Sequence, residues 1–345
     1  MQLYNTLSSK ERAALIEKAG KERLTLSFYK YHHIKNTRIF RNHLFINWNE
    51  LDVLGRIYIA SEGINGQLSV PAENFEKFKT HLDSVDFLEN VRLNIAVEQD
   101  NMSFLKLKVK VRNKIVADGL DDDTFDVTDK GTHVNAETFN ELIEDENTIL
   151  VDMRNHYESE IGHFKNAITP DVDTFRESLP IIEDDLKEHK EDKKLVMYCT
   201  GGIRCEKASA YFKHKGFKDV YQLEGGIIEY TRQVKANDLE NKFIGKNFVF
   251  DDRRAEKISE EVIASCHICG NPCDTHTNCA NEACHILFIQ CEECAERLDR
   301  CCSDACKEVN ALPYEEQKAL RKGKVIENNV FKKGRLKEKT NTSPE

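Results

Sequence analysis

Residues 194–216, KLVMYCTGGIRCEKASAYFKHKG, decide the fold of the central part of this chain. KLVMYC is a short apolar run of the kind that is buried in a parallel sheet. CEKASAYFKHKG has a helical pattern, which Gly216 closes as a C-terminal cap. The residues TGGIR between them leave room for a tight loop. The segment therefore predicts a strand, a loop and the N-terminus of a helix.

Cys199 ends the predicted strand, where several sources of positive charge surround its thiol. Backbone N–H groups of the loop form an anion-binding nest, and the helix dipole adds partial positive charge. Arg204 and Lys207 add full charges nearby. We therefore expect Cys199 to have a lowered pKa and to be a catalytic thiolate, with Arg204 as its partner. A buried structural cysteine is the alternative. The residues of the nest are Thr200, Gly201, Gly202 and Ile203.

Four motifs in this part of the chain resemble, in the same order, those of the rhodanese domain. They are VDMRN (151–155) with Tyr157 and Glu158, GHFKNA (162–167), the loop CTGGIR (199–204) and LEGGI (223–227). The loop cysteine of rhodaneses carries a persulfide, so the resemblance implies that role for Cys199. Cysteine phosphatases with this fold have five residues between cysteine and arginine. Here only the four residues 200–203 intervene, which favours sulfur chemistry over phosphate chemistry.

The further candidate site residues, Cys205, Asp152 and Arg154, allow two interpretations each. Cys205 follows Arg204 directly. It either resolves an oxidised or persulfidated Cys199 through a disulfide, or packs as a small residue in the first helical turn. Asp152 and Arg154 form either a structural ion pair at the sheet edge or a contact to substrate.

The pattern of apolar residues divides the chain into three domains and a tail. Residues 1–125 read as strands and helices in the order β-α-β-β-α-β, with an additional strand or two. This order predicts a ferredoxin-like α+β sandwich. The expected elements lie at 24–34, 38–51, 55–70, 74–85, 91–98 and 104–112. The acidic run 121–126 predicts a solvated linker.

Residues 134–237 alternate strands and helices, which predicts an α/β domain with a parallel sheet. Its strands are expected at 148–154, 194–199 and 219–226. A cysteine-rich region follows at 240–312, and a basic tail, expected to be partly disordered, at 313–345.

The composition predicts a soluble cytoplasmic protein. Charged residues make up 32% of the 345 residues, and no stretch approaches the roughly 20 apolar residues of a membrane helix. The N-terminus lacks the apolar centre of a secretory signal. A net charge of −10 argues against wholesale coating of nucleic acid but leaves room for a local basic surface.

Ten of the twelve cysteines lie between residues 266 and 306. Disulfides are rare in the cytosol, so this clustering indicates a metal. The pairs Cys266–Cys269 and Cys291–Cys294 have the spacing that grips one zinc ion. The other candidate ligands are Cys273, Cys279, Cys284, Cys301, Cys302, Cys306, His267, His276 and His285. Two structural zinc sites would use eight of these thirteen candidate ligands, and the spacing does not show which eight. An iron–sulfur cluster, disulfides and free thiols are the alternatives.

A basic strand and a basic, aromatic segment predict RNA contact by the N-terminal domain. In residues 105–112 apolar and basic residues alternate, so the cations Lys106, Lys108, Lys110 and Arg112 share one face. Residues 23–49 contain no acid. They carry cations such as Arg38 and Arg41 between aromatic residues that could stack on bases. A solvated face and core aromatics are the simpler alternative. The tail, which holds nine cations in residues 318–339, either contacts RNA or is solvated.

The chain as a whole resembles the bacterial oxygen-dependent tRNA uridine hydroxylases of the wobble position. The resemblance rests on Ala60–Gln67 (ASEGINGQ), Cys199–Lys207 (CTGGIRCEK) and residues 266–294. That family joins an acylphosphatase-like N-terminal domain, a rhodanese domain and a cysteine-rich C-terminus. The resemblance implies conversion of uridine to 5-hydroxyuridine, with tRNA as partner and molecular oxygen as co-substrate.

The residues themselves leave the chemistry open. The sequence has no dinucleotide fingerprint for NAD or flavin and no iron facial triad. A Cys199 thiolate could add to C6 of the pyrimidine and activate C5, or an oxidised or persulfidated Cys199 could carry the transferred group. Two other classes compete with the hydroxylase: a rhodanese-type sulfurtransferase, and a non-catalytic RNA-binding protein.

Overall fold

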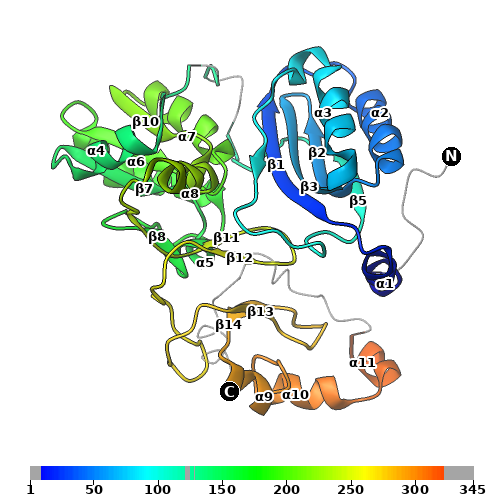
Figure 1. Cartoon of the computed structure of the whole chain (residues 1–345). Helices are drawn as coiled ribbons and strands as arrows, with labels where there is room; N and C mark the ends of the chain where they lie inside the picture. Colours follow the sequence, from blue (N-terminus) through cyan, green and yellow to red (C-terminus); the bar gives the residue numbers. More distant parts are fainter. Residues whose placement is uncertain (1–8, 121–124, 128, 322–345) are drawn as a thin grey trace. The chain divides into compact units, whose positions relative to one another are not determined.

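The computed structural model describes residues 9–120, 125–127 and 129–321 (Figure 1). These residues form two compact units. The first contains Met1–Val151, Leu186–Asn241 and Val249–Glu256; the second contains Asp152–Asp185, Lys242–Phe248 and Lys257–Glu345. No helix of the described residues is long and apolar enough to cross a membrane. Most of the linker 121–126 and of the tail 313–345 lies outside the described residues.

The first unit begins with the predicted ferredoxin-like sandwich. Its elements are α1 (Ser9–Ala19), β1 (Arg23–Tyr31), α2 (Thr37–Glu50), β2 (Leu54–Ala60), β3 (Gly63–Pro71), η1 (Ala72–Asn74), α3 (Phe75–Asp83), η2 (Asp86–Leu88), β4 (Asn94–Ile95) and β5 (Leu107–Val111). The strand order is β4-β1-β3-β2-β5, and helices α2 and α3 cover one face of the sheet (Figure 1). β5 is the predicted additional strand and runs parallel to β2.

The core of this domain lies between the sheet and its two helices. Trp48 of α2 is fully buried and packs against Phe28 of β1 and Phe78 of α3, with ring centroids 6.2 and 5.3 Å apart. Asn36 caps α2 by accepting a hydrogen bond from the Ile39 N–H. Because side chains alternate along β1, Leu26 and Phe28 point into this core. Tyr29 and the residues two positions away from it along the strand point to the opposite, helix-free face of the sheet.

Two strands of the N-terminal sheet are much shorter than predicted. The strands predicted at 24–34, 148–154 and 219–226 also end early, at Tyr31, Asp152 and Leu223. The strand predicted at 91–98 is limited to β4, because the N–H groups of Val97 and Glu98 donate to the Glu256 carboxylate and not to a neighbouring strand. The strand predicted at 104–112 is limited to β5. Its alternation holds for Leu107 and Val109, but Val111 is 40% exposed at the end of this edge strand.

The rest of the first unit is built on the predicted parallel sheet. Its strands are β6 (Thr132–Val134), β7 (Thr148–Asp152), β9 (Lys194–Tyr198) and β10 (Asp219–Leu223), in the order β6-β10-β9-β7. β10 pairs in parallel with both β6 and β9. The accompanying helices are α4 (Ala136–Glu144), η3 (Lys187–His189), α7 (Ile203–His214) and α8 (Gly226–Asn237). Gly216, with φ of +92°, follows α7 as the predicted glycine cap.

The second unit contains short elements and the cysteine-rich region. Its elements are α5 (His156–Ser159), β8 (Gly162–Phe164), α6 (Phe175–Asp185), β11 (Phe243–Phe248), β13 (His276–Asn278), β14 (Leu287–Ile289), α9 (Glu292–Arg297), α10 (Asp304–Ala311) and α11 (Tyr314–Arg321). β12 (Ala255–Lys257) begins in the first unit and ends in the second. β8 and β11 pair antiparallel, as do β13 and β14. Of the basic tail, the described part forms α11, where Arg321 pairs with Glu282.

Replacing Phe78 by Ala should lower the free energy of unfolding of the N-terminal domain by about 3–5 kcal/mol, because it leaves a cavity beside Trp48. Trp48 is the single tryptophan of the chain, so its fluorescence during urea denaturation reports this core. Lys79→Ala, an exposed position on the same helix, is the control and should change stability by less than about 0.5 kcal/mol. Equal midpoints for the two variants would contradict the packing described.

Candidate active site and metal centre

Cys199 lies immediately after β9 and has no exposed surface. The Gly202 N–H donates to its Sγ at 3.1 Å, and Gly202, with φ of +96°, is the N-cap of α7. The carbonyl of Cys199 accepts the Ile227 N–H at the start of α8. Gly226 is needed there, because a Cβ would come within 2.4 Å of that carbonyl oxygen. The sulfur is therefore contacted by the backbone at the start of α7, and the carbonyl of the same residue by the backbone at the start of α8.

The surroundings of Cys199 favour the thiolate. Burial alone would raise the pKa of Cys199, but a hydrogen bond from the Cys205 thiol, the charge of Arg204 and the N–H groups of Cys205 and Arg204 lower it to about 6. Arg204 is nearly buried, and its Nη2 donates to Thr200 Oγ1 at 3.3 Å. At neutral pH most of the Cys199 population is then ionised.

The helix-free face of the N-terminal sheet lies over this loop. The Tyr31 hydroxyl donates to the Ile203 carbonyl at 3.5 Å, and Asn94 Nδ2 donates to the Gly201 carbonyl at 3.3 Å. A Cβ at Gly202 would come within 2.9 Å of the Tyr29 hydroxyl. These contacts are made by residues that the sequence places more than 100 positions from the loop, and apart from Tyr29 and Tyr31 no sequence pattern singled them out.

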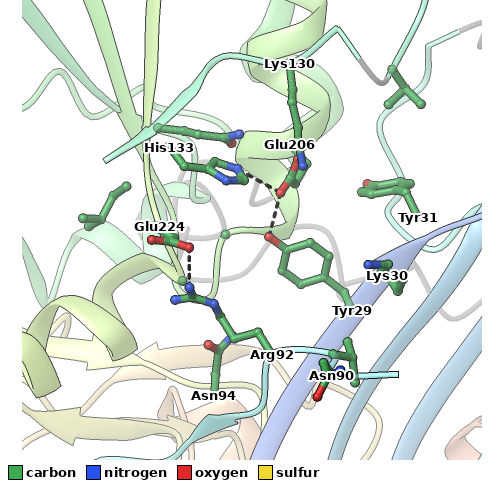
Figure 2. Close-up of a pocket in the computed structure, with 16 residues that line it drawn as sticks. Tyr29, Lys30, Tyr31, Asn90, Arg92, Asn94, Lys130, His133, Glu206 and Glu224 are labelled. Carbon is green, nitrogen blue, oxygen red and sulfur yellow. Dashed lines mark hydrogen bonds and ion pairs between the residues drawn. The ribbon is translucent and has the colours of Figure 1, made fainter. Parts of the chain in front are cut away.

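The carboxylate of Glu206, in the first turn of α7, contacts three side chains. Lys130 Nζ lies 2.8 Å and His133 Nε2 3.0 Å from its carboxylate, and the Tyr29 hydroxyl donates to it at 3.2 Å (Figure 2). Burial would raise the pKa of Glu206, but His133 and Lys130 lower it below its usual value, so the group is ionised. Burial and the charges of Glu206 and Cys199 raise the pKa of Tyr29 well above its usual value, so the phenol stays protonated.

Lys207 does not act as a free positive charge beside Cys199. Its Nζ is fully buried and pairs with Glu62 at 2.7 Å and Asp118 at 3.0 Å. Asp118 also pairs with Lys114. Glu62 belongs to the ASEGINGQ segment, where it also accepts the Ile115 N–H. These ion pairs join α7 to the N-terminal domain.

Asp152 and Arg154 form a buried ion pair within the second unit. Arg154 Nη2 lies 2.6 Å from Asp152 Oδ2 and 2.6 Å from the Gly162 carbonyl oxygen. Neither side chain has exposed surface. This geometry is that of a structural ion pair, one of the two interpretations that the sequence allowed for these residues. Cys205 is also buried and lies in the first turn of α7, within reach of Cys199.

A pocket opens beside the loop in the first unit, with a cavity volume of about 340 Å³. Figure 2 shows Tyr29, Arg92, Lys130, His133, Glu206 and Glu224 around it. Arg92 forms an ion pair with Glu224 across the pocket. The floor includes Gly202 and Gly225, both with positive φ and no side chain.

The predicted RNA-contacting residues separate into two groups. Lys108 and Lys110 are exposed on the face of β5 opposite its buried residues, and Arg56 of β2 is the register partner of Lys108. Burial and the neighbouring charges of Lys106, Arg56 and Lys110 lower the pKa of Lys108. Lys106 is half-buried, and Arg38 and Arg112 are exposed.

Arg41 takes a different position, because its Nε donates to the Val109 carbonyl at the sheet edge. The aromatic residues of the basic segment also divide. Phe45 and Trp48 belong to the core, as the simpler alternative expected, whereas Tyr29 lines the pocket.

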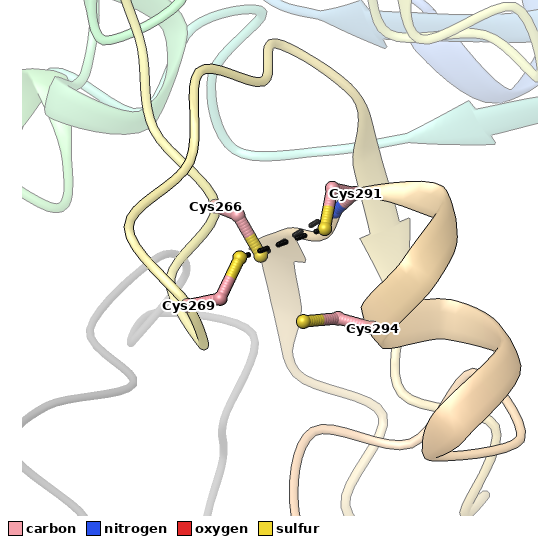
Figure 3. A group of neighbouring side chains, drawn as sticks. All are labelled: Cys266, Cys269, Cys291 and Cys294. Carbon is pink, nitrogen blue, oxygen red and sulfur yellow. Dashed lines mark hydrogen bonds between the residues drawn. The ribbon is translucent and has the colours of Figure 1, made fainter.

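The cysteine-rich region brings eight cysteines into two groups of four. The groups are Cys266, Cys269, Cys291, Cys294 and Cys279, Cys284, Cys302, Cys306, with sulfur atoms within 4.8 Å of one another. In Figure 3 the thiols of the first group converge on a common point, two from a loop and two from the start of α9. Cys273, Cys301 and the three histidines belong to neither group.

The sulfur–sulfur distances in both groups are compatible with a tetrahedral metal site. An ion with metal–sulfur distances of about 2.3 Å holds its sulfur ligands about 3.8 Å apart. The sulfur atoms of Cys269 and Cys291 are 3.6 Å apart, and those of Cys284 and Cys302 are 3.7 Å apart. The Cys291 N–H also donates to Cys266 Sγ, as expected around a thiolate ligand. Each group could hold a metal ion.

Fold and loop together define a rhodanese-like protein with an acylphosphatase-like N-terminal domain. Family models match accordingly: a UPF0176 acylphosphatase-like domain at residues 23–115, a rhodanese-like domain at 135–233 and a rhodanese C-terminal region at 244–307. A solved rhodanese-like domain protein from Staphylococcus aureus is 24% identical over 29% of this chain and 90% of that chain, with a TM-score of 0.24.

Curated relatives match nearly the whole chain. The tRNA uridine(34) hydroxylase of Leptospira interrogans is 54% identical over 98% of this chain and 92% of its own length. The protein of the same name from Photorhabdus laumondii is 53% identical over 96% of this chain and 95% of its own length. The chain belongs to the tRNA uridine(34) hydroxylase family, as the sequence motifs predicted.

Alkylation of Cys199 should show a midpoint near pH 6, about two and a half units below that of a free thiol, because the thiolate is the reactive form. The rate at each pH is measured by mass spectrometry of the Cys199 peptide, which separates it from the other cysteines. Arg204→Met removes the nearby positive charge and should move the midpoint upward. A midpoint near pH 8.5 in the unaltered protein would contradict the proposed thiolate.

Proposed function

We propose that this protein hydroxylates C5 of the uridine at position 34 of tRNA, with Cys199 as the nucleophile. The observation that carries the proposal is the match over nearly the full length to proteins named tRNA uridine(34) hydroxylase. The ionised sulfur of Cys199 supplies the reactive group. With tRNA as the substrate, we infer that the protein acts in the cytoplasm.

Hydroxylation at C5 is a two-electron oxidation. With molecular oxygen as co-substrate, one oxygen atom enters the product and the other leaves as water. The balance requires two electrons and two protons from an external donor. We propose that this donor first reduces oxygen to the level of a hydroperoxide, which then meets the pyrimidine at the Cys199 loop.

The thiolate would act by making C5 nucleophilic. Its electron pair forms a bond to C6, and the C5=C6 π pair moves to C5 and the C4 carbonyl. C5 then attacks the terminal oxygen of the hydroperoxide, whose O–O bond breaks with the electron pair on the departing oxygen. Loss of the C5 proton restores the double bond and expels the thiolate, so Cys199 is regenerated.

Arg204 and the loop N–H groups stabilise the thiolate before it adds to C6 and again when it is expelled. Cys205, held beside Cys199, would return an oxidised Cys199 to the thiol state through a disulfide that an external thiol reduces. The cations Lys106, Lys108, Lys110 and Arg56 would bind the tRNA backbone, because a polyanion relieves their mutual repulsion.

We also propose that the two cysteine groups bind structural zinc. Four thiolates per ion close the tetrahedron and leave no open position for a substrate. Zinc would supply cross-linking in a region whose own apolar core is small.

A sulfurtransferase is the second candidate, because the Cys199 loop is the loop that carries a persulfide in rhodaneses. It would be favoured by thiosulfate–cyanide turnover in a protein that leaves tRNA nucleosides unchanged.

Replacing Cys199 by Ala should abolish 5-hydroxyuridine in cellular tRNA, because the nucleophile is lost. The measurement is nucleoside mass spectrometry of tRNA from a deletion strain complemented with the wild type or with a variant. Cys273→Ala is the matched control, since this buried cysteine belongs to neither metal group. Unchanged 5-hydroxyuridine in the Cys199→Ala strain would reject the mechanism, and its absence from the wild-type strain would reject the function.

The purified protein should contain about two zinc ions per chain by elemental analysis. Cys294→Ser removes one ligand and should lower the zinc content, whereas Cys273→Ser and Cys301→Ser should leave it at two. Iron in place of zinc, or equal loss of metal in all three variants, would contradict the assignment.

A further inference from the structure

The pocket beside Gly202 is built by both the N-terminal domain and the parallel-sheet domain. Tyr29 enters it from β1, Arg92 from the segment before β4 and Asn94 from β4, whereas Gly202 and Gly225 line it from the parallel-sheet domain. Its volume of about 340 Å³ falls within the range of small-ligand sites. One residue of the pocket lining, Gly202, contacts the nucleophile directly, because its N–H donates to Cys199 Sγ.

The glycine floor allows a flat group to approach the loop backbone closely. The Tyr29 hydroxyl lies 2.9 Å from the position that a Gly202 Cβ would occupy, and Arg92 Nη1 lies 3.0 Å from that of a Gly225 Cβ. At Gly202 a side chain of the N-terminal domain thus lies directly over the backbone, whereas at Gly225 the atom nearest to the Cβ position is the Glu229 Cβ, at 2.5 Å. A planar base with an aromatic neighbour and a guanidinium at its edge suits this site once Tyr29 moves aside.

The charges of the pocket suit a phosphate at its mouth. Lys30, Arg92, Lys130 and His133 line it, with Glu206 and Glu224 as the acids. Glu206 is already paired with Lys130 and His133. Arg92 and Glu224 are each more than a third exposed, so their ion pair is weak and can exchange for a phosphate contact.

Asn94 offers a hydrogen-bond acceptor that lacks a donor. Its Nδ2 donates to the Gly201 carbonyl, and because a carbonyl can only accept, the orientation of the amide is fixed. The other amide atom, Oδ1, is buried and has no hydrogen-bond partner among the described residues. A ligand N–H group that donates a hydrogen bond to such a buried acceptor stabilises the complex. Uracil carries one at N3, whereas N3 of cytosine is an acceptor.

We infer that this pocket receives the target uridine of the tRNA, with Asn94 accepting a hydrogen bond from N3–H and Arg92 binding an adjacent phosphate. The inference rests on the proposed function and adds to it the residues that select the base. Because Cys199 and Asn94 Oδ1 are both buried in the free protein, entry of the base requires Tyr29 to shift from its place over Gly202. The hydrogen bond of Tyr29 to Glu206 holds that closed position.

The test measures binding of tRNA transcripts that differ only at position 34, with U or C. The full chain carries Cys199→Ala so that no turnover occurs, and dissociation constants are compared with and without a second substitution. Asn94→Ala should weaken binding of the U34 transcript about tenfold and bring the ratio of the two affinities close to one. A merely structural role of Asn94 would weaken both transcripts equally, which would overturn its assignment.

Arg92→Ala should weaken both transcripts about tenfold, because a phosphate contact carries no base information. Arg92→Lys should restore part of this loss. Lys218→Ala is the matched control, since Lys218 is an exposed cation paired with Glu191 and lies outside the pocket. Should Asn94→Ala fail to fold, Asn94→Ser keeps a donor for the Gly201 carbonyl and tests the same ratio.

Turnover separates this inference from the function on which it rests. If the wild type forms 5-hydroxyuridine and the Asn94 and Arg92 variants bind and react like it, the pocket assignment is overturned while the function stands. If the wild type binds tRNA without forming 5-hydroxyuridine, both are overturned.

Discussion

The buried charge of Lys207 is the constraint on which the arrangement of the active site depends. A fully buried ammonium group must be paired, and here two carboxylates of the N-terminal domain, Glu62 and Asp118, provide the pairing. Removing one partner of such a pair generally costs about 3–5 kcal/mol, because an uncompensated charge is left behind. The rhodanese-type helix α7 and the N-terminal domain are therefore held against each other just after the Cys199 loop ends.

This attachment creates an electrostatic problem that the neighbouring side chains solve. Burial disfavours the Cys199 thiolate, and Glu206 adds a second negative charge beside Tyr29. Lys130 and His133 compensate the charge of Glu206, so that the positive charge of Arg204 and the loop N–H groups act on the sulfur. The site thus combines full burial of Cys199 with a lowered pKa of its thiol.

The sequence predicted the loop better than its surroundings, for a physical reason. The thiolate environment is formed by neighbours in the chain, so its chemistry is visible in CTGGIR alone. Tyr29, Arg92 and Asn94 reach the loop only through the packing of another domain, and Lys207 changes from a local cation to a paired one by the same packing. Val111 and the short β4 show the same limit, since the alternation of apolar residues does not reveal where a neighbouring strand ends.

The cysteine groups show why ligand spacing could identify metal binding without assigning the ligands. In chain order the pairs alternate between sites: 266 and 269 belong to the first, 279 and 284 to the second, 291 and 294 to the first, 302 and 306 to the second. Each site therefore closes a loop that contains a pair from the other, and neither is complete until distant segments meet. If both groups bind an ion, such interleaving would couple the two sites, because binding at either one would remove chain entropy that the other would otherwise have to overcome.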